Sequence, residues 1–308
     1  MKKFQNLYVI LGLFCLFSET SAQFGGTKCS YLAALLIFAG VFSSCNRTAD
    51  YEISDIDSRI NIEMMEILDV STRRLELHCS TARTYPQTCY GIAYELKQSS
   101  NNIDIKYKHI VFNKRCWGDQ VGVADCIINL GMLSPGTYRL NLSIRDDIKY
   151  QGELIVTPDD FQINNIENSE FSFTNNPLGK IPKNTLWGKI GYNYTEGLES
   201  IHSFITALVG LGAIEQKFVM GNYGEFEIGE NGQIVQPVNY SDLEYINGIL
   251  FDKNGNTILP INVNNTGLAF AQSFIFYFSG NFTDAEQLAK DYVDYLSIRL
   301  FSDKGERY

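Results

Sequence analysis

The chain has 308 residues, of which 45% are apolar and 19% are charged, and it carries a formal charge of −10 at pH 7. This length accommodates one large domain or two ordinary ones, and the composition excludes a disordered or fibrous protein. The excess of acidic residues argues against nucleic acid as a partner, because nucleic-acid binding depends on neutralising phosphates. The chain has three His, so we expect no multi-histidine metal or catalytic site.

Residues 1–44 have the features of export signals and are set aside before the fold is considered. Two apolar runs, over residues 7–17 and 31–42, each follow basic residues. The runs have 11 and 12 residues, whereas a membrane-spanning helix needs about 20. The alternatives are two tandem signals, one membrane hairpin, or two hydrophobic anchors.

The end of the second run resembles the export signal of bacterial lipoproteins. In that family a small residue precedes a cysteine that receives acyl chains, palmitate among them, and becomes the mature N-terminus. Ser43 and Ser44 before Cys45 match this pattern, whereas Phe42 replaces the usual Leu. The resemblance implies a lipidated Cys45 and a bacterial cell-envelope location, anchored in a membrane with the protein on its periplasmic or surface face. Translation would then start near Lys28, and the mature chain would carry a charge of −12, since the removed part carries +2.

Four cysteines remain in the mature chain besides Cys45. They are Cys79, Cys89, Cys116 and Cys126, two pairs with members ten positions apart. An even number of cysteines in an exported chain predicts disulfides, and their spacing does not match a structural zinc site. Three connectivities are possible. We expect the two local bridges, Cys79–Cys89 and Cys116–Cys126, because turn residues allow each segment to fold back; a Cys79–Cys126 bridge would instead link different strands.

After a tether over residues 45–60, residues 61–157 predict a β-sandwich. Apolar residues alternate with period two over residues 74–79, 92–96, 103–111, 127–130, 137–144 and 150–156, as in strands with one buried face. The turn at Ser134-Pro135-Gly136 followed by Tyr138 resembles the corner of immunoglobulin-like domains, where a Tyr ties the turn. The resemblance implies an immunoglobulin-like module. Residues 158–169 are polar and are expected to connect this module to a second domain.

Residues 170–308 predict an α+β domain with at least two helices packed on a mainly antiparallel sheet. Apolar residues recur at helical spacing over residues 198–211, and Thr283 with Glu286 forms a capping box for a second helix that extends to Leu300. Asn-Gly pairs at 231–232 and 254–255 predict two hairpins. The apolar segment 268–278 predicts a central strand. We recognise no family resemblance in the sequence of this domain.

A search for catalytic motifs finds no nucleophile elbow, zinc-protease motif or phosphate-binding loop. Asp252 and the two Asn residues that follow it resemble the start of a calcium loop, but no Gly or Glu completes the pattern. We therefore expect no catalytic residue, no metal and no cofactor.

Aromatic residues in the segment 186–194 are the candidate binding residues. They are Trp187, Tyr192 and Tyr194, among small and polar neighbours. Exposed aromatic rings stack on sugars or anchor protein interfaces, whereas the alternative is a buried Trp with glycines for close packing. On a strand, Tyr192 and Tyr194 would point to one face and Trp187 to the other.

Three functional hypotheses follow. The leading one is a non-catalytic binding or structural lipoprotein of the cell envelope that recognises a glycan, a peptide or an envelope protein. The second is a lipid-anchored hydrolase that uses carboxylates such as Asp242, Glu244 and Glu225. The third is a eukaryotic secreted glycoprotein, since Asn-x-Ser/Thr sites occur at Asn141, Asn193, Asn239, Asn264 and Asn281.

Overall fold

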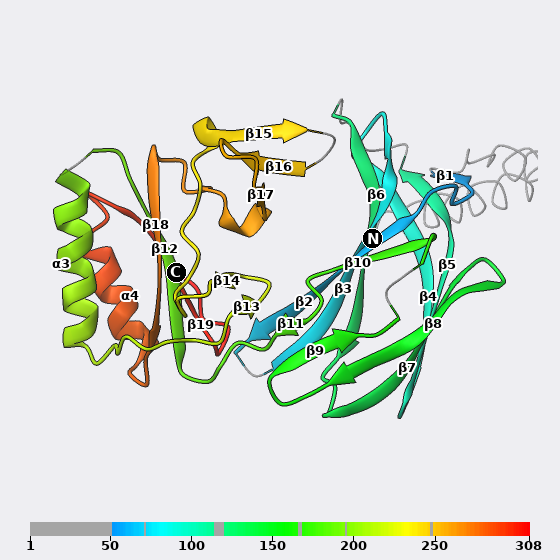
Figure 1. Cartoon of the computed structure of the whole chain (residues 1–308), viewed down its shortest axis with the longest axis horizontal. Coiled ribbons are helices and arrows are strands. Elements are labelled where there is room, and N and C mark those ends of the chain that lie inside the picture. Colours follow the sequence, from blue (N-terminus) through cyan, green and yellow to red (C-terminus); the bar gives the residue numbers. More distant parts are fainter. Residues whose placement is uncertain (1–50, 71, 114–119, 166–167, 195, 247–248) are drawn as a thin grey trace, which may run out of the picture. The chain divides into compact units, whose positions relative to one another are not determined.

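The computed structural model describes residues 51–308, except for residues 71, 114–119, 166–167, 195 and 247–248. The predicted export signals, the lipidated Cys45, the start of the tether and Cys116 lie outside the described residues. The described part is rich in strands and has two α-helices (Figure 1). Neither of these helices has the length and apolar character needed to cross a membrane.

Eleven strands form one mixed sheet. Its hydrogen-bonded order is β10 (Phe171–Thr174), β2 (Ile60–Asp69), β3 (Thr72–Tyr85), β6 (Gly122–Gly131), β4 (Tyr90–Ser99), β5 (Asn102–Asn113), β7 (Gly136–Ile144), β8 (Asp147–Val156), β9 (Asp160–Ile163) and β11 (Leu178–Gly179), with β1 (Tyr51–Ser54) paired to β5. Three neighbouring pairs run parallel: β10 with β2, β5 with β7 and, through one residue pair, β4 with β6. The remaining pairs are antiparallel.

The core of this sheet follows from the alternation in the sequence. On β2, for example, Ile60, Ile62 and Met64 are buried and the residues between them are more exposed, because successive side chains of a strand point to opposite faces. The buried residues of β2, β3, β5, β6, β7 and β8 belong to one apolar cluster. All the strands predicted between residues 74 and 156 lie within strands of this sheet, so that expectation is confirmed.

The sheet curls, because its first and last strands belong to one short stretch of chain. The residues between β10 and β11 bond to both edges of the sheet. The Asn175 amide donates to Glu63 Oε1 of β2 at 2.8 Å, and the Asn176 side chain makes two hydrogen bonds of 2.8 Å with the backbone of Ile163 of β9. The predicted connection at 158–169 thus contains β9, a strand of the sheet, and the sheet continues to Gly179.

Cys79 and Cys126 lie directly opposite each other on the antiparallel strands β3 and β6. Both are free thiols, and they are joined by a hydrogen bond. The expected local bridges are therefore wrong for these two cysteines. The prediction assumed that each ten-residue segment folds back on itself, whereas long-range strand pairing brings Cys79 to Cys126.

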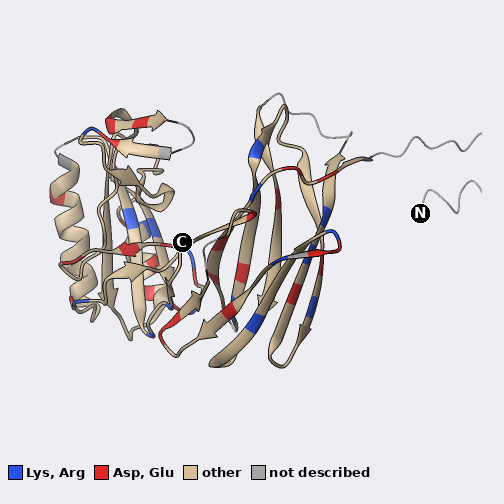
Figure 2. Ribbon diagram, turned by 45° about the vertical axis from the view of Figure 1, so that its right-hand side comes forward, with Lys and Arg blue, Asp and Glu red and all other residues tan. Residues whose placement is uncertain are grey.

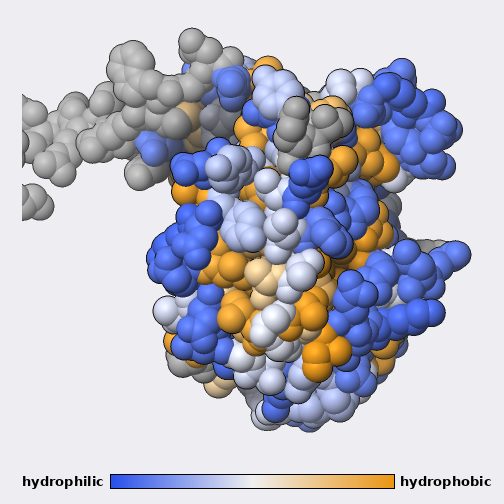
Figure 3. All heavy atoms as spheres, turned by 90° about the vertical axis from the view of Figure 1, so that its left-hand side faces the viewer, coloured by the Kyte–Doolittle hydropathy of each residue, from blue (hydrophilic) through white to orange (hydrophobic). Residues whose placement is uncertain are grey.

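The C-terminal region contains a three-stranded antiparallel sheet with β12 (Thr185–Tyr192) between β18 (Phe270–Tyr277) and β19 (Ser297–Ser302). Helices α3 (Glu196–Gly210) and α4 (Phe282–Lys290) cover one face of it and share an apolar cluster with the three strands. Two helices on an antiparallel sheet were predicted. Figure 3 faces the helical side, where apolar side chains lie among hydrophilic ones.

Two elements differ from the prediction. Helix α4 begins after Asn281, whose side chain accepts from Thr283 N, and it ends at Lys290 rather than at Leu300. The residues beyond it turn and form β19, because pairing with β12 buries Ile298 and Leu300 in a strand. The apolar segment 268–278 forms an edge strand, β18, and β12 takes the central place.

Short elements cross the other face of this sheet. They are β13 (Gly221–Asn222), β14 (Glu227–Ile228), η1 (Tyr240–Asp242), β15 (Leu243–Ile246), β16 (Ile249–Asp252), β17 (Thr257–Ile258) and η2 (Pro260–Asn262). The hairpin predicted at 254–255 is present as β16 and β17. The one predicted at 231–232 is reduced to a single bridge between Ile228 and Ile234, with backbone bonds from Gly229 N to Gln233 O and from Val235 N to Glu227 O. Beyond it, the Gln236 side chain binds the backbone of Ser273 on β18 at 2.9 and 3.0 Å.

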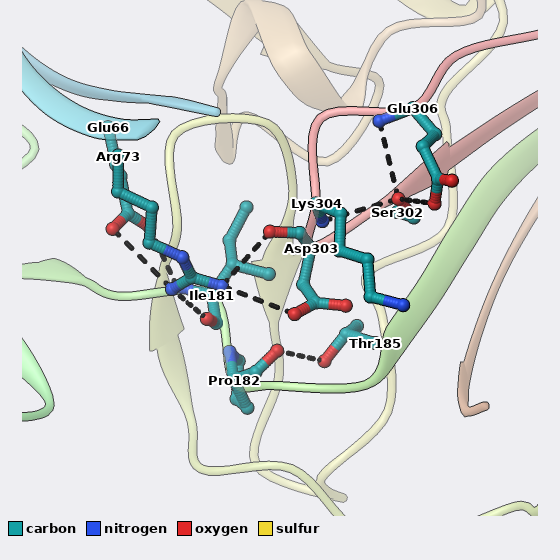
Figure 4. Close-up of polar contacts among 9 residues, drawn as sticks. All are labelled: Glu66, Arg73, Ile181, Pro182, Thr185, Ser302, Asp303, Lys304 and Glu306. Atoms are coloured by element: carbon teal, nitrogen blue, oxygen red, sulfur yellow. Dashed lines mark hydrogen bonds and ion pairs between the residues drawn. The ribbon is translucent and has the colours of Figure 1, made fainter. Parts of the chain in front are cut away.

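An ion pair between Arg73 and the buried carboxylate of Glu66 lies where the large sheet meets the C-terminal region (Figure 4). Glu66 of β2 is 1% exposed; its Oε2 accepts from Ile181 N at 2.9 Å and its Oε1 lies 3.7 Å from Arg73 Nη1. The Arg73 guanidinium also donates to Ile181 O at 2.6 Å and to Asp303 O at 3.1 Å. Burial raises the pKa of Glu66 above its usual value, against the opposing effects of the Ile181 N–H, Arg73 and Lys180.

Candidate functional site

The three predicted binding residues do not lie on one surface. Trp187 is 4% exposed and lies on the face of β12 opposite to the helices, together with an apolar cluster that contains Phe226 and Ile275. Tyr192 is half-buried, lies against the helix-side cluster and contacts the ring of Phe270. Tyr194, beyond the strand, is 74% exposed. The alternation on β12 is as predicted, but a shared binding surface of Trp187 and Tyr192 is not formed.

A cavity of about 150 Å³ opens on the face of the C-terminal sheet that carries Trp187. Its lining comes from all three strands and from the loops that cross this face. The lining residues include Trp187 and Lys189 of β12, Ser273 of β18, Arg299 and Phe301 of β19, and Glu225, Phe226, Val235, Asn262 and Asn265 of the segments between α3 and β18. The lining thus combines aromatic rings with polar and charged side chains.

The aromatic wall is rigid because its rings pack on one another. Trp187 stacks on Phe301, with ring centroids 5.7 Å apart and planes at 20°, and contacts Phe226 at 5.3 Å. Phe226 in turn stacks on Tyr223 at 5.1 Å. Such pairs contribute about 0.5–1.5 kcal/mol beyond the area that they bury. Trp187 thus forms part of the core and also part of the cavity wall.

Two cations form the polar side of the cavity. Lys189 and Arg299 are directly opposite residues of β12 and β19, and Figure 2 shows basic positions close together on strands of this sheet beside the C-terminus. Lys189 Nζ donates to Val263 O at 3.0 Å, Ile261 O at 3.3 Å and Asn265 Oδ1 at 3.4 Å. Arg299 Nη2 donates to Asn265 O at 3.2 Å.

These two cations influence each other. Burial lowers the pKa of the Lys189 ammonium below its usual value, and the positive charge of Arg299 lowers it further. Burial disfavours the charged form of a lysine, and a nearby like charge does the same. A bound negative charge would act in the opposite direction. The site is therefore electrostatically suited to an anion.

The acidic residues named as candidate catalytic groups do not form a pair in this cavity. Glu225 is in the lining, but its Oε1 lies 3.7 Å from Arg307 Nη2. Asp242 forms an ion pair with Lys253, and Glu244 is exposed on β15. Paired catalytic carboxylates need a common substrate position between them, which these residues do not provide.

A wider pocket of about 330 Å³ lies on the large sheet over β2, β3 and β6. Its polar residues are mostly bonded to one another or to neighbours outside the pocket. Asn61 Oδ1 accepts from Ser172 at 2.6 Å, Glu63 accepts from Asn175, and His78 Nε2 lies 3.2 Å from Glu76 Oε2. These contacts engage Asn61, Glu63 and His78, whereas the side chains of Ser80 and Asp125 in the same lining form no hydrogen bond or ion pair with other described residues.

No group of three or more His, Cys, Asp or Glu residues in the described ranges is arranged to hold a metal ion. Asp252 lies at the tip of the β16–β17 hairpin, where its carboxylate accepts from the backbone N–H groups of Asn254 and Asn256 at 2.9 and 2.8 Å. These bonds lower the pKa of Asp252 below its usual value, the contacts with Asn256 having the largest effect. The resemblance to a calcium loop is thus explained by turn geometry.

Sequence reasoning found Trp187 but missed Lys189 and Arg299. Lys189 lies two residues beyond Trp187, and period-two alternation places both side chains on one face, so this lysine carried a usable signal. Arg299 did not, because its position beside Lys189 depends on pairing between strands more than 100 residues apart and because residue 299 was expected to be helical.

No protein-family model matches this chain, and neither does any curated protein or solved structure.

Proposed function

We propose that this protein is a lipid-anchored, non-catalytic binding protein of the bacterial cell envelope. The observation that carries the proposal is the C-terminal cavity, whose lining combines packed aromatic rings with polar and charged side chains. Such a combination is typical of sites that bind small molecules or the exposed parts of larger ones. The ligand would be a part of an envelope glycan, peptide or protein.

The sequence supports the anchoring. An apolar run that ends in Ser43-Ser44-Cys45 is the basis for lipidation at Cys45. Acyl chains stabilise membrane binding by about 0.8 kcal/mol for each buried CH₂. The predicted tether over residues 45–60 would then be shorter, because Tyr51–Ser54 form β1 and pair with β5; the residues before β1 would link the strand-rich part to the membrane, and the cavity would be presented to envelope components.

The large sheet would act as the spacer next to the membrane, as an immunoglobulin-like module does. Tyr138 supports this comparison, because its hydroxyl donates to Ser134 O at 2.8 Å and so ties the turn before β7. A corner tyrosine of this kind bonds back to the backbone a few residues upstream in immunoglobulin-like domains. In this proposal the large sheet, from β1 to β11, forms the module, and the part from β12 to the C-terminus forms the ligand-binding domain.

The alternative of a eukaryotic glycoprotein is disfavoured by Asn264. Asn264 is 4% exposed. Its Nδ2 donates to Asn239 Oδ1 at 3.0 Å and to Leu268 O at 2.9 Å. A glycan on Nδ2 would replace one of its two hydrogens, and thus remove at least one of these hydrogen bonds, and it would have no room at this buried position. The hydrolase alternative has no specific observation in its favour.

Blocking the cavity tests the proposal. Val235 lines the cavity and is half-buried, so Val235→Trp should fill the cavity, whereas Val219, which is 78% exposed and outside the lining, provides the matched control Val219→Trp. Binding of soluble muropeptides, the sugar–peptide fragments of bacterial cell wall, is measured by calorimetry with the chain from residue 46 onward. We expect V235W to weaken binding at least about tenfold, equal to about 1.4 kcal/mol, and V219W to leave it unchanged. Equal binding by both variants, each with an unchanged melting curve, would contradict a role for the cavity.

A further inference from the structure

Two positive charges lie side by side in the cavity without a negative partner. Lys189 and Arg299 are directly opposite on antiparallel strands, an arrangement in which like charges destabilise a sheet. In the described part of the chain, no carboxylate forms an ion pair with either side chain. The strand pairing therefore has an electrostatic cost that a bound anion would remove.

The hydrogen bonds distinguish the roles of the two cations. An ammonium has three donors and a guanidinium has five. The three contacts of Lys189 Nζ with oxygens of residues 261–265 use its donors, so Lys189 holds this loop and supplies charge. Arg299 makes one hydrogen bond, to Asn265 O, and it is exposed. Its remaining N–H groups are directed at no acceptor among the described residues and are available to a ligand.

We propose that the cavity binds the carboxylate group of its ligand, with Arg299 donating to the carboxylate oxygens and Lys189 adding charge from beside it. This inference rests on the proposed function, because it names the chemical class of the ligand at the same site. A planar guanidinium matches a carboxylate with two parallel hydrogen bonds.

The rest of the lining favours a carboxylate over a phosphate. Glu225 belongs to the same cavity and would repel a doubly charged anion more than a singly charged one. Trp187, Phe226 and Phe301 offer apolar contact to the carbon atoms that a carboxylic acid has and inorganic phosphate lacks. The cavity volume is about 150 Å³, well above the roughly 10–15 Å³ that one water molecule requires. That space suits a carboxylate with a few carbon atoms, such as the acidic end of a sugar acid or a peptide.

Trp187 provides a signal from inside the site. The chain has two tryptophans, Trp117 and Trp187, so in a Trp117→Phe background the fluorescence reports the cavity wall alone. The chain from residue 46 onward is titrated at constant ionic strength with propionate and glucuronate. Propionamide and glucose are the neutral counterparts, and inorganic phosphate is the competing anion. We expect saturable changes with the two carboxylates and at least tenfold weaker responses to the other compounds, since a hydrogen bond to a charged group contributes about 1.5–3 kcal/mol.

Arg299→Gln should weaken the binding of both carboxylates about tenfold or more. The matched control is Arg139→Gln, because Arg139 is also an exposed strand arginine but lies on β7, outside the cavity lining. This control should bind like the parent. Should the Trp117→Phe chain fail to fold, saturation-transfer NMR of the same ligands with the unsubstituted chain and the two arginine variants gives the same comparison.

The results separate this inference from the proposed function. Equal responses to propionate and propionamide, tighter binding of phosphate, or an Arg299→Gln variant that binds carboxylates like the parent would overturn the carboxylate inference; the proposed function would stand if V235W still lost muropeptide binding. Carboxylate binding that depends on Arg299, together with muropeptide binding that V235W leaves unchanged, would support the carboxylate site and overturn the proposed function.

Discussion

Glu66 is a buried carboxyl group whose partner, the N–H of Ile181, lies on a distant part of the chain. It is 1% exposed, bonds to Ile181 N at 2.9 Å and faces Arg73 at 3.7 Å. Desolvation dominates over these favourable contacts, and the pKa of Glu66 is raised. A buried ion pair of this kind adds little net stability, but removal of one partner leaves an unpaired charge.

The pH dependence of stability should reveal the raised pKa of Glu66. A carboxyl with a raised pKa binds more protons in the folded than in the unfolded chain, so its contribution is complete below the usual pKa and is lost as pH rises through the raised value. Each unit of the raised pKa corresponds to about 1.4 kcal/mol. We therefore expect the free energy of unfolding of Glu66→Gln, minus that of the parent, to increase from pH 4 to pH 8 in urea titrations. A difference that is constant over this range would show that Glu66 does not titrate as described.

Arg73 should contribute more to the stability of the fold than its partly exposed position implies. Arg73→Leu leaves Glu66 charged and unpaired and removes the bonds to Ile181 O and Asp303 O. Because Arg73 is about one-third exposed, we expect a loss near the lower end of the roughly 3–5 kcal/mol seen when a buried pair loses a partner. Urea unfolding measures it, with Arg139→Leu as the control. A loss as small as that of the control would mean that the contact is dispensable.

The aromatic residues predicted for binding should differ in their contribution to stability, because they differ in burial. Trp187 packs against Phe226 and Phe301, so Trp187→Ala should cost about 3–5 kcal/mol. Tyr194 is 74% exposed, so Tyr194→Ala should change stability by less than about 0.5 kcal/mol. Chemical denaturation of both variants decides the matter, and similar values for the two would contradict the description of Trp187 as part of the core.

Among the elements, strands β3 and β6 place two thiols in register. Opposite residues of an antiparallel pair have Cα atoms about 4.5–5.5 Å apart, within the range of a disulfide. The hydrogen bond with Cys79, followed by burial, raises the pKa of the Cys126 thiol, so the reduced pair should react slowly with alkylating reagents. Cys79 Sγ also lies 3.2 Å from the hydroxyl of the buried Tyr107.

We expect Cys79 and Cys126 to form a disulfide after export. A disulfide donor of the oxidising compartment would accept the two electrons and two protons of the thiols and be released as two thiols. Peptide mapping without reduction should yield a Cys79–Cys126 crosslink, and its reduction should cost about 2–4 kcal/mol of stability. The double variant Cys79→Ser, Cys126→Ser serves as the control and should be insensitive to reduction at this site. A crosslink between Cys79 and Cys89 would contradict the strand register.

The sequence predicted the elements that local patterns determine. Alternation located the strands of the large sheet, and helical spacing located α3, because both depend on side chains close together in the chain. It could not predict that residues 297–302 are a strand, since their pattern of Ile298 and Leu300 fits either a strand or the end of a helix. Pairing with β12 decides the outcome there, and the same pairing brings Arg299 beside Lys189. The sequence therefore did not reveal Arg299 as a site residue for the same reason that it did not reveal β19: both depend on pairing with β12.

At the scale of the whole molecule, the proposed function requires an anchored chain. Cys45→Ser should move the protein from the membrane fraction to the soluble fraction, whereas Cys29→Ser, a second cysteine of the export region, should leave it in the membrane. Intact mass of the membrane-extracted protein should show an acylated chain that begins at Cys45. An unmodified N-terminus at Gln23 would contradict the anchor and favour cleavage after the first signal.

Photoaffinity labelling tests most directly whether the C-terminal cavity is the binding site. The full-length protein, in membranes of cells that express it, is irradiated with muropeptides that carry a photoreactive group, and the labelled peptides are identified by mass spectrometry. We expect labels in the segments that line the cavity, residues 185–192, 225–235, 261–265 and 297–302, and their loss in Val235→Trp. Labels over residues 61–63, 78–80 and 123–127 instead would place the ligand in the pocket of the large sheet and contradict the account.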